Sequence, residues 1–572
     1  MSEQSSGLTS LGKIITVALI LGLIGGGIYL LRNSGDSMSS QEQARTPTIA
    51  EPDSSAKEQA EPVALPEPAE MQAEVPRLDP PAPYIPVDNT IVVELREYAG
   101  YAGLIAANGG LEPNENSIIT KRHGFKVKLT LSEEESWSKL NAGQMAASAT
   151  TADVLAIYGR QFNVIVPAQI GFSRGADGVV VRSDIKKINQ LKGKTLATGQ
   201  FTEAEFFIRY LAQEAGIGVN MLPDLDAVPN PEKVNLVFAE DAFVAGDLFL
   251  QQVTSGKGNL AGCITWAPKT TEVADGSGGK AHVLVTNKNL LIVADILIVN
   301  KGFAEQNPKM VEGLVDGLLE GNRMVRDTPS AHRDLIARAF KWSPDDVDAE
   351  LAKVHLSNLP ENEAFFSGAI DAAGSFGGIY QSAVLAYGPE LVPNPPASER
   401  FLDLKHLATM KQSGRFDGQQ IAIAPIRSTG ATPTLENDPL LSKDIRFTFL
   451  ANSSTLDLQS PQNLEQLESI KKLLTVSPGS IVSLRGHVDD AKVEEFKRQG
   501  PEIMRRMTLA GVELSKNRAN EIMRLLVERH NVPQNRLEAV GAGWREPIGK
   551  DPDAEKRMEQ NRRVEVQWFT VE

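Results

Sequence analysis

The 572-residue sequence predicts an α/β protein with two folded regions. Two observations predict this class. Short apolar runs alternate with amphipathic helical patterns from about residue 89 to residue 395, and the same alternation returns on a smaller scale after residue 436. Such alternation implies parallel sheets covered by helices on both faces. We expect five segments, which are a membrane anchor (1–32), a disordered linker (33–88), the larger folded region (89–395), a connector (396–435) and the smaller folded region (436–572).

The composition limits the function classes. A net charge of −15 argues against nucleic-acid binding, which needs a basic face. The single cysteine, Cys263, excludes an internal disulfide framework and any multi-thiolate metal site. The histidines form no HExxH-type pair, and no nucleophile and base can be placed together from the sequence. We therefore expect no catalytic residues, no metal and no cofactor, and hence a protein that is not an enzyme.

An apolar run without charged residues extends from Ile14 to Leu31, between Lys13 and Arg32. At about 1.5 Å per residue, a helix of this length nearly crosses a hydrocarbon core about 30 Å thick. A cleaved signal peptide has a shorter apolar core and an Ala-x-Ala exit, which is absent here. The favoured interpretation is an uncleaved single-pass anchor, and a removed signal peptide is the alternative.

Residues 33–88 are rich in proline and acidic residues and almost lack aromatic residues. A segment of this composition cannot bury enough apolar surface to fold. In an extended form, at about 3.1 Å per residue, it would hold the following region more than about 100 Å from the membrane. We therefore expect a disordered linker.

Strands and helices alternate in the larger region. The predicted strands are 90–95, 152–158, 178–182, 194–198, 234–238, 261–266 and 281–286, and the clearest helices are 202–217 and 307–327. Sheets of this class bind ligands in the crevice beyond the carboxyl ends of their strands. Candidate ligand contacts are therefore polar and aromatic side chains in the loops that follow strands.

The segment VVVRSDIKKINQLKGKTLATGQFTEAEFFIRYLAQEAGI (179–217) resembles the hinge region of periplasmic ABC-transporter substrate-binding proteins of the nitrate, sulfonate and thiamine-precursor type. In that family, SDI…LKGKTLA crosses into the second lobe. A strand that ends in Trp-x-Pro, here AGCITWAPKT, lies on the cleft side. The resemblance implies a two-lobed clamshell that closes on a small-molecule ligand between its lobes.

The candidate ligand contacts are Tyr98, Tyr101, Ser173 and Arg174 on the first lobe and Gln200, Thr202, Glu203, Glu240 and Trp266 on the second. A structural alternative exists for TEAE (202–205), in which Thr202 is only the N-cap of a helix and Glu205 stands at capping-box spacing. A helix N-terminus that faces a cleft suits an anion. The acidic residues nearby instead favour a cation or a zwitterion, so the ligand class stays open.

The smaller region is expected to begin with a strand (445–457) and a helix (463–476). One face of this helix carries Leu464, Leu467, Ile470 and Leu474. The predicted strand SIVSLRG (480–486) then leads into GHVDD (486–490). The acidic residues at this strand end are either part of a turn, because Gly and Asp favour turns, or part of a binding site.

Four motifs occur in order in this region: GHVD at a strand end, LSKNRA on a helix, GAG at a strand exit and NRRVE on the last strand. Together they resemble the OmpA-like peptidoglycan-binding domain family. In that family, the Asp of the first motif accepts the ammonium group of diaminopimelate in the peptide stem, and the Arg of the helix motif pairs with its carboxylate. The matching residues here are Asp489 and Arg518. The resemblance places Asn561 and Arg562 at the same pocket, whereas Arg563 is either part of it or a solvated strand residue.

The chain departs from the family between these motifs. A charged insert (491–513) stands where the family has a short Gly-x-x-x-x-Asn turn, and Gly511 falls at the position of the Asn. Pro501 is placed to start a helix that continues into the segment of Arg518. We expect an exposed helical extension that leaves the pocket open.

Two functions are compatible with these expectations. The first is a periplasmic solute-binding protein of a Gram-negative bacterium, anchored in the inner membrane and tethered to peptidoglycan, that presents a small ligand to an ABC permease or a sensor. The second is a structural protein that bridges the inner membrane and peptidoglycan, with the clamshell as a spacer or partner-docking unit. A working cleft around Ser173, Gln200 and Trp266 distinguishes the two.

Overall fold

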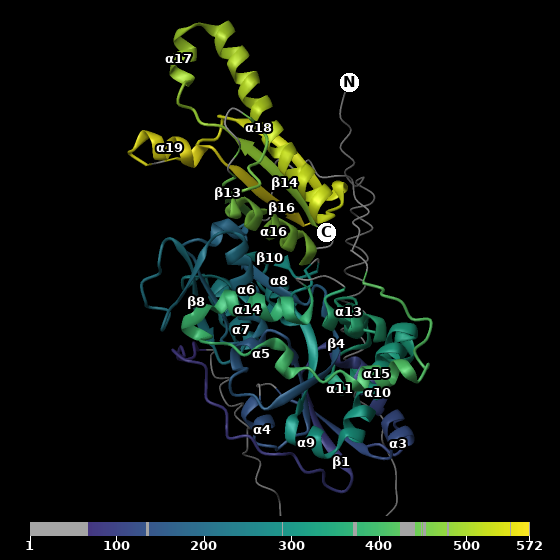
Figure 1. Cartoon of the computed structure of the whole chain (residues 1–572). Helices are drawn as coiled ribbons and strands as arrows, with labels where there is room; N and C mark the ends of the chain where they lie inside the picture. The colour runs from purple at the N-terminus through teal and green to yellow at the C-terminus, as the bar shows by residue number, and fades with distance from the viewer. Residues whose placement is uncertain are drawn as a thin grey trace, which may run out of the picture. The chain divides into compact units, whose positions relative to one another are not determined.

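The structure is a computed structural model of the chain (Figure 1). It describes residues 67–132, 136–288, 290–369, 374–423, 441–447, 449, 453–476, 480–549 and 551–570. The predicted membrane anchor (14–31) and residues 33–66 of the predicted linker lie outside these residues. Among the residues that the structure describes, no helix is both long and apolar enough to cross a membrane.

The first lobe is built on a six-stranded sheet. In spatial order its strands are β12 (Val354–Leu356), β4 (Val164–Ser173), β11 (Ala294–Asn300), β3 (Ala147–Thr151), β1 (Thr90–Leu95) and β2 (Lys126–Leu131). Its helices are η1 (Ala99–Tyr101), α2 (Ala102–Asn108), α3 (Ile118–His123), α4 (Trp137–Asn141), α9 (Lys301–Gln306), α10 (Pro308–Asp327), α11 (Pro329–Phe340), α12 (Pro344–Leu351), α13 (Leu359–Ser367), η3 (Ser398–Phe401) and α15 (Lys405–Gln412).

The second lobe contains the other large sheet. In spatial order its strands are β10 (Ala281–Thr286), β5 (Asp177–Arg182), β9 (Leu260–Trp266), β6 (Thr195–Gly199), β8 (Lys233–Ala239) and β7 (Gly218–Met221). Its helices are η2 (Ile188–Leu191), α6 (Glu203–Glu214), α7 (Ala242–Ser255) and α8 (Lys269–Gly276). Helix α14 (Phe376–Leu391) packs against α6 and against α5 (Val154–Tyr158), which lies between β3 and β4 in the chain.

The expectation of parallel sheets is correct for only part of each lobe. Strands β2, β1 and β3 are parallel, as are β7, β8, β6 and β9. In contrast, β11 runs antiparallel to β3 and β4, β12 antiparallel to β4, and β5 antiparallel to β9 and β10. The reason is the path of the chain. It leaves the first lobe on β4 and returns on the neighbouring β11, so these two strands point in opposite directions.

Two further expectations about the larger region are wrong. The predicted strand 152–158 is mostly helix α5, whose residues are all buried. A short apolar run that is buried on every side shows no periodicity that separates a helix from a strand. In addition, SDI…LKGKTLA (183–197) lies wholly within the second lobe, because the chain has already crossed between Ser173 and Asp177.

Close packing of α10 against α2 positions the start of α2, which lies beside the cavity described below. A Cβ on Gly321 of α10 would lie 1.9 Å from the backbone oxygen of Gly103 on α2. A Cβ on Gly103 would in turn lie 2.9 Å from the backbone nitrogen of Asn322. Only glycine permits this distance between two backbones, so these residues allow α10 to hold the first turn of α2 in its place beside the cavity.

Residues 67–84, here called the strap, run along both lobes in an irregular conformation (purple in Figure 1). The first half of the strap binds the second lobe. The Ala69 amide donates to the backbone oxygen of Phe238 at 2.8 Å. The Gln72 backbone and the Gln200 side-chain amide form two reciprocal hydrogen bonds of 2.8 Å each.

The second half of the strap binds the first lobe. The Leu78 amide donates to Gln161 Oε1 and the Ala82 amide donates to the backbone oxygen of Asn141, each at 2.9 Å. Tyr84 is only 6% exposed. The prediction of a disordered linker is therefore wrong for residues 67–84. The composition of this segment does not reveal its order, because the hydrogen-bond partners belong to the folded lobes.

The C-terminal domain has a four-stranded sheet. In spatial order its strands are β13 (Leu441–Ile445), β16 (Val564–Thr570), β14 (Ser480–His487) and β15 (Leu537–Gly543). Its helices are α16 (Pro461–Val476), α17 (Val493–Arg498), α18 (Pro501–His530), η4 (Gln534–Arg536) and α19 (Ala554–Asn561). Strands β14 and β15 are parallel, and the other two pairs are antiparallel.

Of the strand expected at 445–457, Ile445 ends β13, Phe449 and Leu456 form an isolated antiparallel bridge, and residues 448 and 450–452 lie outside the described residues. Helix α16 forms as expected, and Leu467, Ile470 and Leu474 are buried. Leu464 is 43% exposed, because the buried stripe of this helix is narrower than its apolar pattern.

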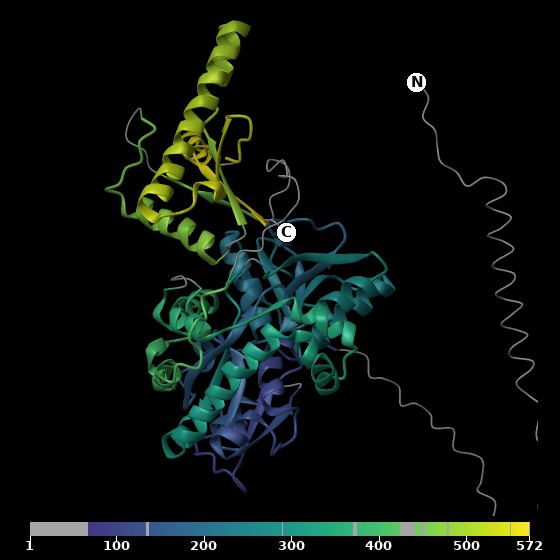
Figure 2. The ribbon, with the colours of Figure 1, turned by 90° about the vertical axis from the view of Figure 1, so that its right-hand side faces the viewer.

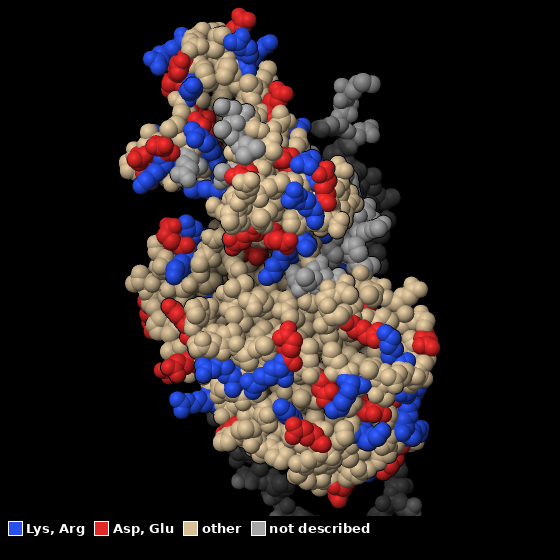
Figure 3. Space-filling model, in the orientation of Figure 1, with Lys and Arg blue, Asp and Glu red and all other residues tan. Residues whose placement is uncertain are grey.

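The insert (491–513) forms α17 and the first turns of α18. Pro501 begins α18 at its first helical position, as expected, and the helix continues without a break through Arg518. These first turns project beyond the sheet (Figures 1 and 2). Acidic and basic side chains are mixed over this extension (Figure 3).

Candidate functional site

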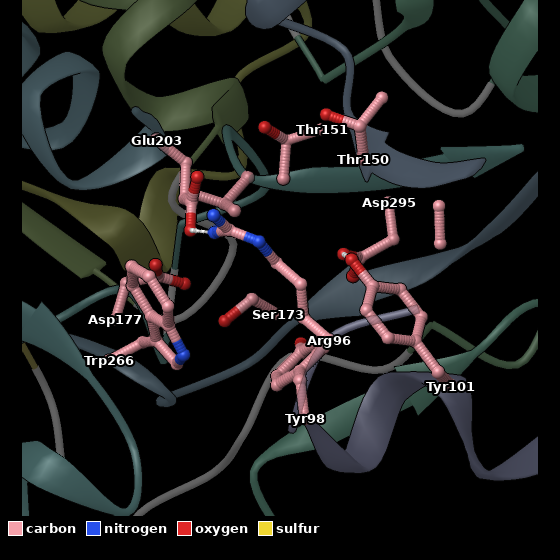
Figure 4. A pocket seen from close by; sticks show the side chains of 12 residues that line it. Arg96, Tyr98, Tyr101, Thr150, Thr151, Ser173, Asp177, Glu203, Trp266 and Asp295 are labelled. Atoms are coloured by element: carbon pink, nitrogen blue, oxygen red, sulfur yellow. Dashed lines mark hydrogen bonds and ion pairs between the residues drawn. The ribbon is translucent and has the colours of Figure 1, made fainter. Parts of the chain in front are cut away.

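A small polar cavity of about 30 Å³ lies between the two lobes of the larger region (Figure 4). Its volume is enough for a water molecule or a group of similar size. The first lobe contributes Arg96, Tyr98, Tyr101, Ala149, Thr150, Thr151, Ser173, Val293 and Asp295, and the second contributes Asp177, Glu203 and Trp266.

The topology brings these residues together. Arg96 and Thr151 stand at the carboxyl ends of the parallel strands β1 and β3. In the second lobe, Trp266 ends β9, and Glu203 is the first residue of the helix that follows β6. The cavity therefore occupies the crevice beyond the carboxyl ends of the strands, where sheets of this class bind ligands.

Three carboxylates meet one guanidinium in this cavity. Asp177, Glu203 and Asp295 are 2%, 8% and 2% exposed. Arg96 reaches across the cavity to Glu203, with 3.9 Å between Nη1 and Oε1, and its guanidinium carbon lies 5.2 Å from the centre of the Trp266 ring (Figure 4). The carboxylates therefore outnumber the single basic residue among those that line the cavity.

Burial and mutual repulsion perturb the acids. Burial raises the pKa of Asp177 to about 7, with a further contribution from the charge of Glu203, although Asn287 Nδ2 donates a hydrogen bond of 2.9 Å to Asp177 Oδ2. Burial and the charge of Asp177 also hold the pKa of Asp295 well above its usual range. The Tyr101 hydroxyl donates to Asp295 Oδ1 at 3.2 Å. Groups with such shifts in a cleft are characteristic of functional sites.

Several polar atoms that line the cavity make no hydrogen bond of ordinary length and angle with the described residues. They are the hydroxyl oxygens of Tyr98, Thr151 and Ser173 and Oδ2 of Asp295. Ser173 is nevertheless close enough to Asp177 and Tyr98 to stabilise their ionised forms. Tyr98 is likewise close enough to Asp295 to stabilise its ionised form. Buried polar atoms are nearly always hydrogen-bonded, so a cluster of exceptions calls for an explanation. A bound polar ligand would supply the missing partners.

The structure brings five of the nine predicted ligand contacts to this cavity, namely Tyr98, Tyr101, Ser173, Glu203 and Trp266.

The other four predicted contacts lie outside the cavity. The Arg174 side chain donates from Nε to the backbone oxygen of Lys288 at 2.8 Å, and Gln200 is bonded to the strap. Thr202 stands at the N-cap position of α6, as the structural alternative expected, but its hydroxyl donates to the backbone oxygen of Gly199 at 2.9 Å. The capping box is therefore absent, and Glu205 accepts from the amide of Phe201 instead. Glu240 is exposed.

Sequence reasoning did not find Arg96, Thr150, Thr151, Asp177 and Asp295. One of these carried a usable signal. Asp295 is the single charged residue of the buried strand ADILIVN, and a charged residue in a buried strand is uncommon enough to indicate a site. The other four residues stand at strand ends, and no local pattern separates them from ordinary loop residues.

A second cluster lies in the C-terminal domain. Asp489 follows β14, and its Oδ2 accepts a hydrogen bond of 2.7 Å from Arg562 Nε. Arg518, on α18, lies with its guanidinium carbon 5.0 Å from the centre of the Phe449 ring. Burial lowers the pKa of Arg518, the charge of Arg562 lowers it further, and Asp489 opposes this shift. Arg518 Nε is buried without a hydrogen-bond partner in the part of the chain that the structure describes.

Asn561 and Arg563 are buried beside this cluster and hold its loops in place. Asn561 is 1% exposed, its Oδ1 accepts from the amides of Ile548 and Gly549 at 2.9 and 2.8 Å, and its Nδ2 donates to Asp490 at 3.2 Å. Asn561 therefore holds loops in place. Arg563 is 4% exposed and donates to the backbone oxygen of Glu546 at 3.3 Å, so it is not a solvated strand residue.

Gly511 stands where the family has an Asn. A Cβ at this position would lie 2.9 Å from Cζ3 of Trp544, so the indole occupies the space that a side chain needs. The insert nevertheless leaves the cluster accessible, because the side chains of Asp489 and Arg562 are 24% and 51% exposed.

Comparison with known families assigns this domain. Residues 448–562 match the OmpA family. This part of the chain is therefore an OmpA-family domain. Outer membrane protein Omp38 from two strains of Acinetobacter baumannii is 28% identical to this chain over 148 residues. The match covers 25% of this chain and 36% of each relative, so it spans about a third of their length.

Solved structures of periplasmic binding proteins match somewhat more than half of the chain. The periplasmic aliphatic sulphonate binding protein SsuA from Escherichia coli has a TM-score of 0.41 and 15% identity, and covers 56% of this chain and 97% of its own. The periplasmic nitrate-binding protein NrtA from Synechocystis has a TM-score of 0.41 and 12% identity, and covers 59% of this chain and 92% of its own. The alkanesulfonate-binding protein SsuA from Xanthomonas axonopodis, bound to MOPS, has a TM-score of 0.40 and 12% identity, with 56% and 100% covered.

Proposed function

We propose that the protein is a periplasmic solute-binding protein that is anchored in the inner membrane and tethered to peptidoglycan, and that it presents a small ligand to an ABC permease or a sensor. The observation that carries this proposal is the cavity between the lobes, where buried polar atoms of Tyr98, Thr151, Ser173 and Asp295 make no hydrogen bond of ordinary length and angle within the described residues. A spacer has no use for such a cluster, because each buried polar atom without a partner destabilises the fold by about 1–3 kcal/mol.

Mass spectrometry tests ligand capture directly. The full chain is extracted gently from its cells in mild detergent and analysed under native and denaturing conditions. The expected result is a bound small molecule that is released on denaturation. If the protein is empty and a screen of anions, amino acids and pyrimidines produces no thermal shift, the solute-binding proposal fails.

The tether to peptidoglycan is proposed to act through Asp489 and Arg518. Asp489 would accept the ammonium group of a diaminopimelate side chain, and the buried donor of Arg518 would pair with its carboxylate. Arg562 already contacts Asp489 and lies on the same face. A charge-assisted hydrogen bond is typically worth about 1.5–3 kcal/mol. Loss of either residue should therefore weaken binding roughly 10- to 100-fold.

Sedimentation with purified peptidoglycan measures this effect. Asp489→Ala and Arg518→Ala should leave the protein in the supernatant, while circular dichroism shows that the domain is still folded. Arg505→Ala is the matched control, because this residue is exposed on the projecting part of α18. The pocket assignment is wrong if both variants sediment like the parent protein.

Membrane anchoring is proposed from the apolar run at Ile14–Leu31, which lies outside the described residues. Fractionation of cells tests it. An anchored chain stays with the inner membrane after carbonate washing and dissolves in detergent, whereas a chain released by cleavage appears in the periplasmic fraction.

The second candidate function is that of a structural bridge between the inner membrane and peptidoglycan. Two observations favour it, which are the small size of the cavity, about 30 Å³, and the strap that is bonded to both lobes. In this case the clamshell would act as a spacer or docking unit. Cells that carry Glu203→Gln would then keep the function of the protein, whereas Asp489→Ala would remove it.

A further inference from the structure

The charge of the cavity indicates which ligands it can accept. Three buried carboxylates, those of Asp177, Glu203 and Asp295, face one guanidinium. Arg96 is the single Lys, Arg or His among the described residues that line the cavity, and it lies beside Glu203. Buried carboxylates that lack a counter-charge keep their protons, which is the direction of the raised pKa values of Asp177 and Asp295. A cation favours the ionised carboxylates of this site, whereas an anionic ligand would raise these pKa values further.

The position of Arg96 shows how the cavity holds a cation. Its guanidinium lies against the carboxylate of Glu203 and 5.2 Å from the centre of the Trp266 ring, and Phe243 supports that ring at a centroid distance of 4.9 Å. A carboxylate beside the face of a tryptophan is a favourable environment for guanidinium and ammonium groups. In this structure the occupant is a side chain of the protein itself.

The remaining polar atoms of the cavity suit a donor-rich ligand. The hydroxyls of Tyr98 and Ser173 and Oδ2 of Asp295 make no hydrogen bond of ordinary length and angle within the described residues, and each is able to accept one, Asp295 in its ionised form. A group with several N–H donors would satisfy these acceptors. A bare metal ion is a poorer fit, because among the described residues no group of three or more His, Cys, Asp or Glu side chains is arranged to hold one.

We propose that the cavity binds the cationic end of a small molecule, an ammonium or guanidinium group, and that Arg96 occupies the place of this group until the ligand displaces it from Glu203 and Trp266. This inference rests on the proposed solute-binding function and adds the ligand class. It makes Arg96 an internal competitor, so that loss of its charge strengthens the binding of cations.

Matched probes test the proposal on the full chain in detergent by isothermal titration calorimetry. Propylammonium and propylguanidinium are compared with propanesulfonate and nitrate. We expect the wild-type protein to bind a cation and neither anion. Glu203→Gln should weaken cation binding about tenfold or more, since a charge-assisted hydrogen bond is lost. Arg96→Gln should strengthen it by a similar factor. Glu240→Gln is the control, because that acidic residue is exposed outside the cavity and should change nothing.

The outcomes separate the two levels of the proposal. Binding of propanesulfonate or nitrate that disappears in Arg96→Gln would overturn the cationic ligand class and leave solute binding intact. Cation binding that weakens in Arg96→Gln would show that Arg96 helps to hold the ligand and does not compete with it. If neither class of probe binds to the wild-type protein or to Arg96→Gln, the cationic ligand class is refuted, and the mass-spectrometric test and the ligand screen decide separately whether the protein binds a solute at all.

Discussion

The strap offers the sharpest test of the structure, through the substitution Tyr84→Ala. Tyr84 is 6% exposed, and its ring packs edge-on against Phe303 at a centroid distance of 5.6 Å. Its hydroxyl accepts from the Val92 amide at 3.2 Å, and its own amide donates to Asn300 Oδ1 at 3.3 Å. These contacts join the end of the strap to the first lobe.

The magnitude follows from these contacts. Truncation of a buried aromatic side chain to alanine costs about 3–5 kcal/mol, and the lower end applies here because the strap lies at the surface and can relax. A loss of about 3 kcal/mol raises the opening equilibrium of the strap roughly 100-fold. Tyr84→Phe removes only the hydrogen bonds of the hydroxyl and should raise the opening equilibrium of the strap about fivefold.

Hydrogen exchange is the appropriate assay, because global unfolding of a chain with several domains is not a single transition. The amides of Leu78, Asp79 and Ala82, which are bonded to side chains and backbone of the first lobe, should be protected in the wild-type protein and lose protection in Tyr84→Ala. Ile85→Ala is the matched control, since the neighbouring Ile85 is 60% exposed.

Two results would refute this reasoning. If the three amides of the wild-type protein exchange as fast as those of an unfolded chain, the strap is not bound to the first lobe. Unchanged protection in Tyr84→Ala would show that Tyr84 does not hold it. If the prediction is confirmed, the strap also restrains the lobes, because any opening of the clamshell must stretch it or peel it from one lobe.

The remaining predictions concern charge and packing. The affinity for an alkylammonium probe should rise about tenfold between pH 6 and pH 8, because Asp177, which faces Glu203, Asp295 and Tyr98, loses its proton near pH 7. Calorimetry at the two pH values measures this affinity. An affinity that does not change with pH contradicts the prediction. The native state keeps a proton on Asp177 that the unfolded state releases near about pH 3.9, so thermal stability should fall as the pH rises from that value through 7. Asp177→Asn should reduce this fall. Gly321→Ala should lower stability by about 2 kcal/mol or more, because its Cβ would meet the backbone of Gly103, whereas Gly377→Ala, whose nearest atom would be 3.7 Å away, should be neutral in the same thermal scan.

Much of the local structure could be predicted from the sequence, because hydrophobic periodicity is a local property. The strands at 261–266 and 480–486 and the helices at 307–327 and 463–476 lie where their patterns predict them. Proline at position 501 likewise predicted the start of α18. The short run at 152–158 was misassigned because complete burial removes the alternation on which such a prediction depends.

The motifs of the OmpA-family domain were also recognisable, because each is a short stretch at a fixed place in the fold. The contacts were not. Arg562 is the direct partner of Asp489, Asn561 braces loops, and Arg563 is buried against Glu546, although these three residues are adjacent in the chain. Side-chain direction after a helix end depends on tertiary packing, so adjacency in sequence does not imply a shared role.

The sequence by itself determined the α/β class, the presence of an OmpA-family domain and four of the seven cavity residues that carry a ring or a charge. Only the tertiary structure decided which side chains meet. Arg96, Asp177, Glu203 and Asp295 come from distant strand ends, and their common burial turns ordinary loop residues into a charged cavity. The strap shows the same principle, because a proline-rich segment with no core of its own becomes ordered where folded lobes present matching donors and acceptors.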